Sequence, residues 1–423
     1  MGRGAERALR AALSMQEAIT AFNAAHGLHL EAHFGINTGL VIAGSIGTSS
    51  QQNYSVMGDA VNLAAHLGHL SQRGEILVGP DTYRRTHHLF SFKALGPLRV
   101  KGKADPVPVY KLMGLRAQPG SWRGLEGRGI SSPLVGRDEE VASFTHCLDR
   151  LLGGQGSLVS ISGEAGLGKS RLVAEVRRQM AHQSLLWLEG RTLSFSKTIS
   201  YWPFLEIIQA DTGITAEDHE GQRWAKLERR ICSLFPEEST EILPYLATLL
   251  SLNVPGNLAE RVKYLDGETM GRQVFRSTRR FFARLAQERP LVLIFEDLQW
   301  IDHSSALLLE HLLPLVREVP LLICSVGRPD SESPSTRLRE IAVKDYADCY
   351  KEIALTPLSP AESAQLVHNL LPIDALIPRL REGLLHKAEG NPFFLEEMIR
   401  VLIDLGAFVR DRNTGRWQAT AQV

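Results

Sequence analysis

A glycine-rich stretch with the residue types needed to hold a phosphate chain lies at Gly163-Glu-Ala-Gly-Leu-Gly-Lys169-Ser170. The apolar run 158–162 before it is typical of a buried strand, and the run 171–180 after it has apolar residues on one helical face. A strand, the pattern Gly-x-x-x-x-Gly-Lys-Ser and a helix together predict a phosphate-binding loop. The alternative is a purely structural glycine turn.

The loop residues have separate predicted roles. Gly163, Gly166 and Gly168 let the backbone bend so that successive N–H groups face a polyphosphate. The helix that begins near Lys169 adds the positive end of its dipole. We expect Lys169 to reach the β- and γ-phosphates and the Ser170 hydroxyl to bind Mg²⁺. The expected ligand is therefore ATP with Mg²⁺.

A second chemical pattern follows the apolar run 291–295, which predicts a buried parallel strand. Glu296 and Asp297 come directly after it, at the end where α/β sheets bind ligands. This is a Walker B pattern: one acid holds Mg²⁺ and the other orients or activates the attacking water. The sequence leaves open which acid does which. The alternative is that both are solvated surface residues.

Another buried strand is predicted at 321–326, and Gly327-Arg328-Pro329 follows it. Arg328 is a candidate sensor that reaches a γ-phosphate, and a surface loop arginine is the equal alternative. A second candidate strand covers 185–189, and 138–152 is predicted as a helix. The region 200–286 is predicted to be mostly helical, with breaks at its prolines 236, 244 and 255.

Bulk properties restrict the function. The chain has 423 residues, 47 basic and 47 acidic, with 44% hydrophobic and 22% charged residues. That balance is typical of a globular protein and argues against a chain-wide nucleic-acid or anionic-membrane surface. No apolar run approaches a membrane span, and the four cysteines are far apart, without metal-ligand spacing. We expect a cytoplasmic protein with no membrane partner and no evident nucleic-acid partner.

The first 113 residues have a different pattern. Helices are expected at 5–25, 59–70 and 81–88, and strands at 28–36, 40–44, 54–57, 75–78, 98–103 and 107–113. The turn signal Asn37-Thr-Gly39 joins the first two strands. These elements predict an α+β domain with antiparallel character, not a doubly wound sheet.

Three strings in this segment carry a family resemblance: Phe34–Gly47, Tyr54–His66 and Val100–Lys103. They closely resemble the class III adenylate/guanylate cyclase catalytic domain, over 1–113 and over only the second part of that ferredoxin-like domain. The resemblance implies that Ser55 reads the purine, with a preference for ATP. It further implies that Asn62 orients the ribose and that Lys103 binds the triphosphate.

The segment also departs from the family. The two metal-binding aspartates of the family precede the helix that begins here near Ala5, and the arginine expected four residues after Asn62 is His66. Without metal ligands the two-metal reaction loses its Lewis acid. We expect an incomplete cyclase domain, inactive as it stands, that comes from a truncated gene or is vestigial. A longer chain or a partner with a second cyclase domain is the alternative source of the missing aspartates.

Residues 114–132 are glycine-rich and predict a flexible linker. The remainder, 133–423, resembles the STAND branch of AAA+ ATPases. The supporting strings are Leu134–Arg137, the glycine-rich loop, Phe295–Asp302, Gly327–Pro329 and Glu389–Pro392. In that family the equivalents of Val135, Gly136, Arg137 and Pro392 lie against the adenine. The implied fold is a P-loop NTPase with a parallel sheet over 133–355, then a helical lid and the start of a winged-helix element over 356–423, truncated at the chain end.

Local signals place the lid helices. Ser359 and Glu362 form a capping box, Asn391 caps a helix that continues to Leu405, and a hairpin is expected at 408–418. Upstream, Asp302 or Ser304 is expected to cap a helix over 305–318.

The two resemblances together match the layout of soluble-adenylyl-cyclase-like signalling proteins, of which this chain looks like the middle portion. The leading hypothesis is an ATP-binding STAND-type switch with slow ATPase activity. One alternative is an adenylate cyclase that makes cyclic AMP when a longer chain or partner completes it. Another is a non-enzymatic or transcriptional regulator. Expected partners are ATP and either a homo-oligomer or a second cyclase domain.

Overall fold

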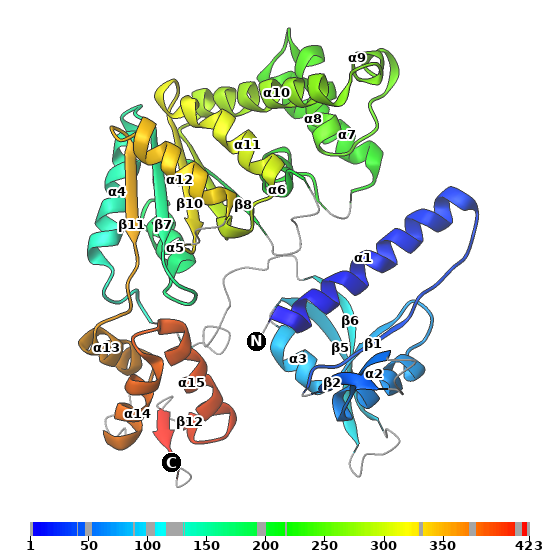
Figure 1. The fold of residues 1–423 in the computed structure, drawn as a ribbon, viewed down its shortest axis with the longest axis vertical. Helices are drawn as coiled ribbons and strands as arrows, with labels where there is room; N and C mark the ends of the chain where they lie inside the picture. Colours follow the sequence, from blue (N-terminus) through cyan, green and yellow to red (C-terminus); the bar gives the residue numbers. More distant parts are fainter. Residues whose placement is uncertain are drawn as a thin grey trace. The chain divides into compact units, whose positions relative to one another are not determined.

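The computed structural model describes residues 3–39, 41–46, 53–87, 89–98, 106–115, 130, 132–192, 200–215, 218–329, 333–371, 378–410 and 417–420. It divides into two compact units, Met1–Ile130 and Ser131–Val423, which are described separately below (Figure 1).

The first unit is an α+β fold. Its elements are α1 (Arg3–His26), β1 (Phe34–Ile36), β2 (Ile42–Ile46), β3 (Asn53–Met57), α2 (Asp59–Leu70), β4 (Ile76–Val78), α3 (Pro80–Thr86), β5 (Phe90–Leu98) and β6 (Val107–Leu115). The main sheet has the order β1-β4-β6-β5, in which β1 and β4 are parallel and the other pairs antiparallel. Strands β2 and β3 form a separate antiparallel pair.

The sheet of the first unit is covered on both faces. One face packs on α1 through a cluster that includes Leu9 and Phe90, and the other packs on α2 through Leu67 and Leu77. The expected α+β character is confirmed. Residues 37–39 lie on the connection from β1 to β2, as expected, but these two strands do not pair with each other, because β1 pairs with β4 and β2 pairs with β3.

Strand boundaries also differ from expectation in this unit. Strand β5 begins at Phe90 and ends at Leu98, and no strand was expected there before Leu98. The strand expected at 98–103 lies outside the described residues from position 99 onward. The polar helix expected over 81–88 is α3, which begins at Pro80. Proline at the first helical position is favourable because its missing N–H would have no partner there.

The second unit is built on a five-stranded parallel sheet in the order β11-β7-β10-β9-β8. Its strands are β7 (Ser157–Ser162), β8 (Leu186–Arg191), β9 (Leu291–Glu296), β10 (Leu321–Gly327) and β11 (Tyr350–Ala354). Strand β11 was missed in the sequence because only Ile353 among its five residues is buried. The P-loop α/β architecture is thus as expected.

Helices cover both faces of this sheet (Figure 1). They are α4 (Asp138–Leu152), α5 (Lys169–Gln179), α6 (Trp202–Thr212), α7 (Glu220–Leu234), α8 (Ser239–Leu249), α9 (Glu260–Lys263), α10 (Gly267–Glu288), α11 (His303–Leu312) and α12 (Pro334–Asp345). Alternate residues of β9 separate the two cores: Val292 and Ile294 join the cluster under α4 and α5, and Leu293 and Phe295 join that under α6 and α10.

Two proline positions explain where helix predictions failed. Pro244 lies inside α8, where no break occurs, because the proline and most of its neighbours are buried in the larger core. The helix expected over 305–318 changes after Leu312 to a 3₁₀ segment, Leu313–Arg317. Pro314 lacks the N–H that would continue the α-helix. Asp302 is the N-cap, accepting a bond from the N–H of Ser305 at 2.9 Å.

The chain then forms a smaller helical group, α13 (Pro360–Leu370), α14 (Pro378–Ala388) and α15 (Pro392–Asp404), which we call the lid (Figure 1). The capping box of Ser359 with Glu362 and the Asn391 cap are confirmed. Strands β12 (Phe408–Arg410) and β13 (Trp417–Ala419) pair antiparallel, as the hairpin prediction requires.

Candidate functional site: the carboxyl ends of β7, β9 and β10

The glycine-rich loop connects β7 to α5. Gly166 and Gly168 have φ of 87° and 92°, in the left-handed region that favours glycine. Gly168 is the N-cap of α5, so the first N–H groups of this helix point into the loop. Gly163 lies against the end of β11: a Cβ there would be 2.9 Å from the Leu355 carbonyl oxygen. These glycines form the type of concavity that binds anions.

Lys169 begins α5 and bends back over the loop. Its Nζ donates to the carbonyl oxygens of Gly163, at 2.7 Å, and Glu164, at 2.9 Å. Burial lowers the pKa of Lys169, and the nearby Arg328 cation lowers it further, while Asp297 and Glu296 act in the opposite direction. The structure thus brings the loop lysine, the Arg328 cation and both acids within electrostatic reach of one another.

Ser170 and Glu296 meet directly across the site. The Ser170 hydroxyl donates to Glu296 Oε2 at 2.7 Å. Glu296 ends β9 and is only 5% exposed. Burial raises the pKa of Glu296, and the neighbouring acids Glu189 and Asp297 add to the rise, whereas Ser170 and Arg191 oppose it. A hydroxyl and a carboxylate in this position are hard oxygen ligands of the kind Mg²⁺ takes.

Asp297 points elsewhere because its backbone turns. Its φ of 57° is left-handed, which is unusual for a residue other than glycine. Asp297 Oδ1 accepts a hydrogen bond from Gln299 Nε2 at 3.2 Å, and Gln299 Oε1 accepts one from the Arg328 N–H at 3.1 Å. The two acids are adjacent in sequence but are held by different partners.

Thr192 and Gln299 are site residues that sequence reasoning missed. The Thr192 hydroxyl donates to the backbone oxygen of Glu296 at 3.2 Å and also to that of Asp297. Gln299 is 4% exposed. Gln299 lies within the string Phe295–Asp302, but nothing in that string gave it a role of its own. For Thr192 the available signal was its position just after a strand.

The residues predicted to lie against the adenine are on the segment before α4. Val135 and Arg137 are buried, and Gly136 has a φ of 63°. Arg137 donates to Glu140 at 3.2 Å and to the Thr356 carbonyl oxygen at 2.5 Å. Its guanidinium is thus engaged with the chain that enters the lid.

The lid touches this segment and the phosphate loop. A Cβ at position 136 would collide with the Glu362 carboxylate of α13, so glycine permits this close approach. The Asn391 side chain donates to the Ala165 carbonyl oxygen at 2.9 Å, and the Phe393 N–H donates to that of Gly166 at 3.3 Å. Pro392 lies between these two contacts, at the first position of α15.

An ion pair extends the contact between the lid and α5. Arg171 lies 2.8 Å from Glu396 of α15, and the two side chains are 29% and 18% exposed. Arg171 also donates to the Ser132 carbonyl oxygen. The lid, the segment before α4 and the phosphate loop therefore meet through direct contacts.

The predicted cyclase residues are only partly described. Ser55 lies in β3, opposite Gly44 of β2. Asn62 is exposed on α2, and His66 is half-buried one turn later. Lys103 lies outside the described residues. Within the described residues, no group of three or more His, Cys, Asp or Glu side chains could hold a metal ion.

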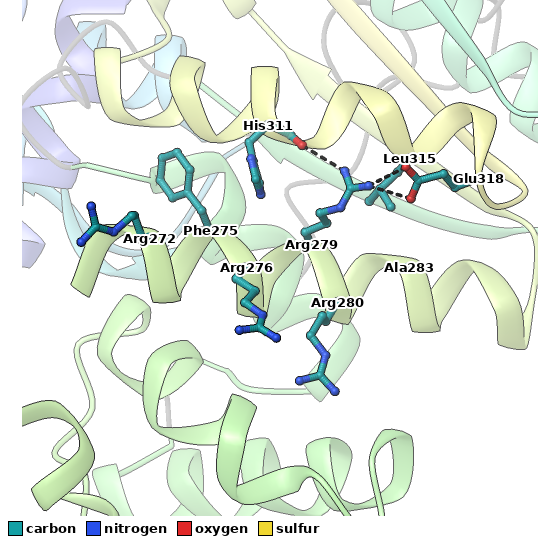
Figure 2. Close-up of a pocket in the computed structure, with 9 residues that line it drawn as sticks. All are labelled: Arg272, Phe275, Arg276, Arg279, Arg280, Ala283, His311, Leu315 and Glu318. Carbon is teal, nitrogen blue, oxygen red and sulfur yellow. Dashed lines mark hydrogen bonds and ion pairs between the residues drawn. The ribbon is translucent and has the colours of Figure 1, made fainter. Parts of the chain in front are cut away.

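A separate hollow of about 680 Å³ lies between α10 and the α11 region. Figure 2 shows that its arginines diverge: Arg279 turns toward Glu318, and Arg276 and Arg280 point the other way. Arg279 binds both Glu318 carboxylate oxygens at 2.6 Å, and Arg280 pairs with Glu238. Because these cations do not converge, the hollow lacks the geometry of an anion site.

In the described part of the chain, no helix has the length and apolar character of a membrane span. Family models match three segments. Residues 133–324 match the AAA ATPase domain, 3–114 match the adenylate and guanylate cyclase catalytic domain, and 359–407 match a domain of unknown function.

Relatives with longer chains match most of this one. An uncharacterized protein of Rhizobium meliloti is 25% identical over 93% of this chain and 37% of its own. The adenylate cyclase type 10 of Mus musculus is 24% identical over 87% of this chain and 22% of its own. The chain thus spans less than two fifths of the length of these relatives.

Among solved structures, the adenylyl cyclase CyaB from P. aeruginosa is 28% identical, over 27% of this chain and 62% of its own, with a TM-score of 0.26. A STAND protein with a tetratricopeptide repeat sensor from Pyrococcus horikoshii is 15% identical, over 63% of this chain and 30% of its own, with a TM-score of 0.31. The AAA ATPase and cyclase families generally use a nucleoside triphosphate with Mg²⁺.

Proposed function

Because the chain joins an adenylate and guanylate cyclase catalytic domain to an AAA ATPase domain, we propose that residues 133–423 form an ATP-dependent switch. The module binds ATP with Mg²⁺, hydrolyses it slowly and changes the position of its lid. The observation that carries the proposal is the contact of Ser170 with Glu296, beside a loop with the geometry of a phosphate site.

On the phosphate side, the loop N–H groups and the N-terminus of α5 supply positive potential. Lys169 already donates to the loop carbonyl oxygens, so it needs only to exchange these for phosphate oxygens. Arg328, from the end of β10, adds a second cation near Lys169. Together these groups orient the triphosphate and balance its charge.

From their contacts we infer different roles for the two acids. Glu296 lies against the Ser170 hydroxyl at 2.7 Å, so this pair would hold Mg²⁺. When bound, that ion neutralises charge on the β- and γ-phosphates. Asp297 turns away toward Gln299 and Arg328, so it would orient the attacking water and accept its proton.

The base side links binding to the lid. Val135, Gly136, Arg137 and Pro392 would enclose the adenine, and Gly136 also lies against Glu362 of the lid. Asn391 contacts the phosphate loop itself. Any shift of that loop during hydrolysis would therefore alter a lid contact, which is the physical requirement for a switch.

For residues 1–113 we propose a nucleotide site shared with a second cyclase domain, in which Ser55, Asn62 and Lys103 contact the nucleotide. The support is the family match over 3–114 and the exposed position of Asn62 on α2. The second domain would come from another copy of this chain or from a different protein. Cyclic AMP measured with and without such a partner tests this.

The experiment for the ATPase module uses the full chain and its Lys169→Ala variant. A charge-assisted contact of about 1.5–3 kcal/mol is lost, so a fluorescent ATP analogue should bind about tenfold to over a hundredfold more weakly. Lys344→Ala, an exposed lysine near the end of α12, is the matched control and should bind as the unaltered chain does. Equal affinity in all three proteins would refute the proposal.

A further inference from the structure

Gln299 is a buried polar side chain that the roles above do not use. It lies in the short 3₁₀ turn Leu298–Trp300, directly after the acid pair, and is 4% exposed. A buried amide must satisfy its donors and acceptor within the protein, since each unsatisfied group is costly. The partners of this amide therefore indicate why a glutamine occupies the position.

Three hydrogen bonds fix Gln299, and they connect different parts of the site. Its Nε2 donates to Asp297 Oδ1 at 3.2 Å, and its Oε1 accepts from the Arg328 N–H at 3.1 Å. Its backbone oxygen accepts from the Ser333 hydroxyl at 3.0 Å, at the N-cap of α12. The side chain bridges the end of β9 to the end of β10, and its backbone is tied to α12.

Only one orientation of the amide suits these partners. Asp297 offers a carboxylate oxygen, which accepts, and Arg328 offers an N–H, which donates. Turning the amide over would place its oxygen against the carboxylate and its NH₂ against the N–H. Gly327 leaves the space for the oxygen, because a Cβ there would be 3.2 Å from Gln299 Oε1.

We propose that Gln299 is a positioning residue for ATP hydrolysis: it holds the Asp297 carboxylate toward the attacking water and ties it to the backbone of Arg328. This inference rests on the proposed function, because it assigns Asp297 to the water. Asp297 has left-handed backbone geometry, so nothing in a regular strand or helix fixes its side chain. A neutral donor can hold a carboxylate in place without adding a second negative charge.

The first test compares hydrolysis with binding in the full chain. Gln299→Leu keeps the approximate size but removes both side-chain hydrogen bonds. Hydrolysis at saturating ATP should fall by about tenfold to a hundredfold, the usual cost of losing a hydrogen bond to a charged group. The affinity for an ATP analogue should change by less than about threefold, since the phosphate loop is untouched.

A second variant separates positioning from simple packing. Gln299→Glu keeps the size of the side chain and an oxygen that can accept from the Arg328 N–H, but it replaces the donor to Asp297 with a second carboxylate. Hydrolysis at saturating ATP should therefore fall at least as far as in Gln299→Leu, although the packing is kept. Gln183→Glu, at an exposed glutamine before β8, is the control and should hydrolyse ATP as the unaltered chain does.

The outcomes are distinct. If the unaltered chain hydrolyses ATP in a Lys169-dependent way and Gln299→Leu is equally fast, this inference alone is overturned. A loss in Gln299→Leu without a loss in Gln299→Glu also overturns it, because that pattern indicates a merely structural role. Absence of Lys169-dependent hydrolysis in the unaltered chain would overturn both this inference and the proposed function.

Discussion

The two adjacent acids should fail in different ways when each is neutralised. Glu296→Gln removes the charge from a side chain that is 5% exposed and lies 2.7 Å from the Ser170 hydroxyl. Asp297→Asn removes the charge from a side chain held by Gln299 at 3.2 Å. The first change should weaken Mg²⁺ binding, and the second should slow the chemical step.

The contacts set the expected sizes. The charge of a buried carboxylate that lies against a hydroxyl and would bind Mg²⁺ contributes about 1.5–3 kcal/mol to the free energy of Mg²⁺ binding. The Mg²⁺ concentration for half-maximal activity of Glu296→Gln should therefore rise about tenfold to a hundredfold. A general base contributes about 10²- to 10⁴-fold, so the rate of Asp297→Asn at saturating Mg²⁺ and ATP should fall by that factor. Its Mg²⁺ requirement should change little.

Dependence on pH gives an independent check on Glu296. Burial raises the pKa of this carboxyl above its ordinary value, so the folded protein takes up the proton at a higher pH than an exposed glutamate would. The unaltered chain should lose Mg²⁺ affinity as the pH falls toward that raised pKa. Glu296→Gln carries no such proton, so the difference between the two proteins should shrink toward low pH.

The assay is phosphate release at fixed saturating ATP, with Mg²⁺ varied at several pH values. Glu237→Gln is the matched control, because Glu237 is an exposed acid in the turn between α7 and α8. It should leave both constants nearly unchanged. The reasoning is refuted if both acid variants shift the Mg²⁺ requirement equally, or if Asp297→Asn shifts it and Glu296→Gln does not.

Two further predictions concern the lid and the first unit. Glu396→Gln weakens the 2.8 Å pair with Arg171, so release of a fluorescent ADP analogue should accelerate by about two- to fivefold, as for a part-exposed ion pair. Glu397→Gln, which weakens a pair with Arg400 of the same helix, should not change the release. Gly35→Ala places a Cβ against the backbone of α2 and should lower the free energy of unfolding of the first unit by about 1–3 kcal/mol. The temperature of a thermal transition in near-ultraviolet circular dichroism should fall accordingly. Gly4→Ala, in open space on α1, should not lower it. Unchanged release of the ADP analogue from Glu396→Gln would contradict the role of its pair with Arg171. Unchanged melting of Gly35→Ala would contradict the close approach of Gly35 to α2.

Much of the fold was predictable because its signals are local. The helix 138–152 and the Ser359 capping box are each specified by residues within one or two turns, and the structure reproduces both. Predictions failed where packing decides. Pro244 is accommodated in α8 by a buried environment that no local rule represents. Strand β11 lies at the sheet edge beside β7, so its pattern lacks a continuous apolar run.

The candidate site, like the fold, could be predicted from the sequence only in part. Spacing alone located the phosphate loop and the acid pair, since those motifs depend on residues within a few positions of each other. The separate environments of Glu296 and Asp297 could not be read from spacing, because they follow from the left-handed turn at Asp297. That turn sends one carboxylate to Ser170 on α5 and the other toward Gln299 and the end of β10. Since each acid is fixed by a distant element, a change at either element should alter one acid without the other, and this independence is what lets binding and hydrolysis be separated by mutation.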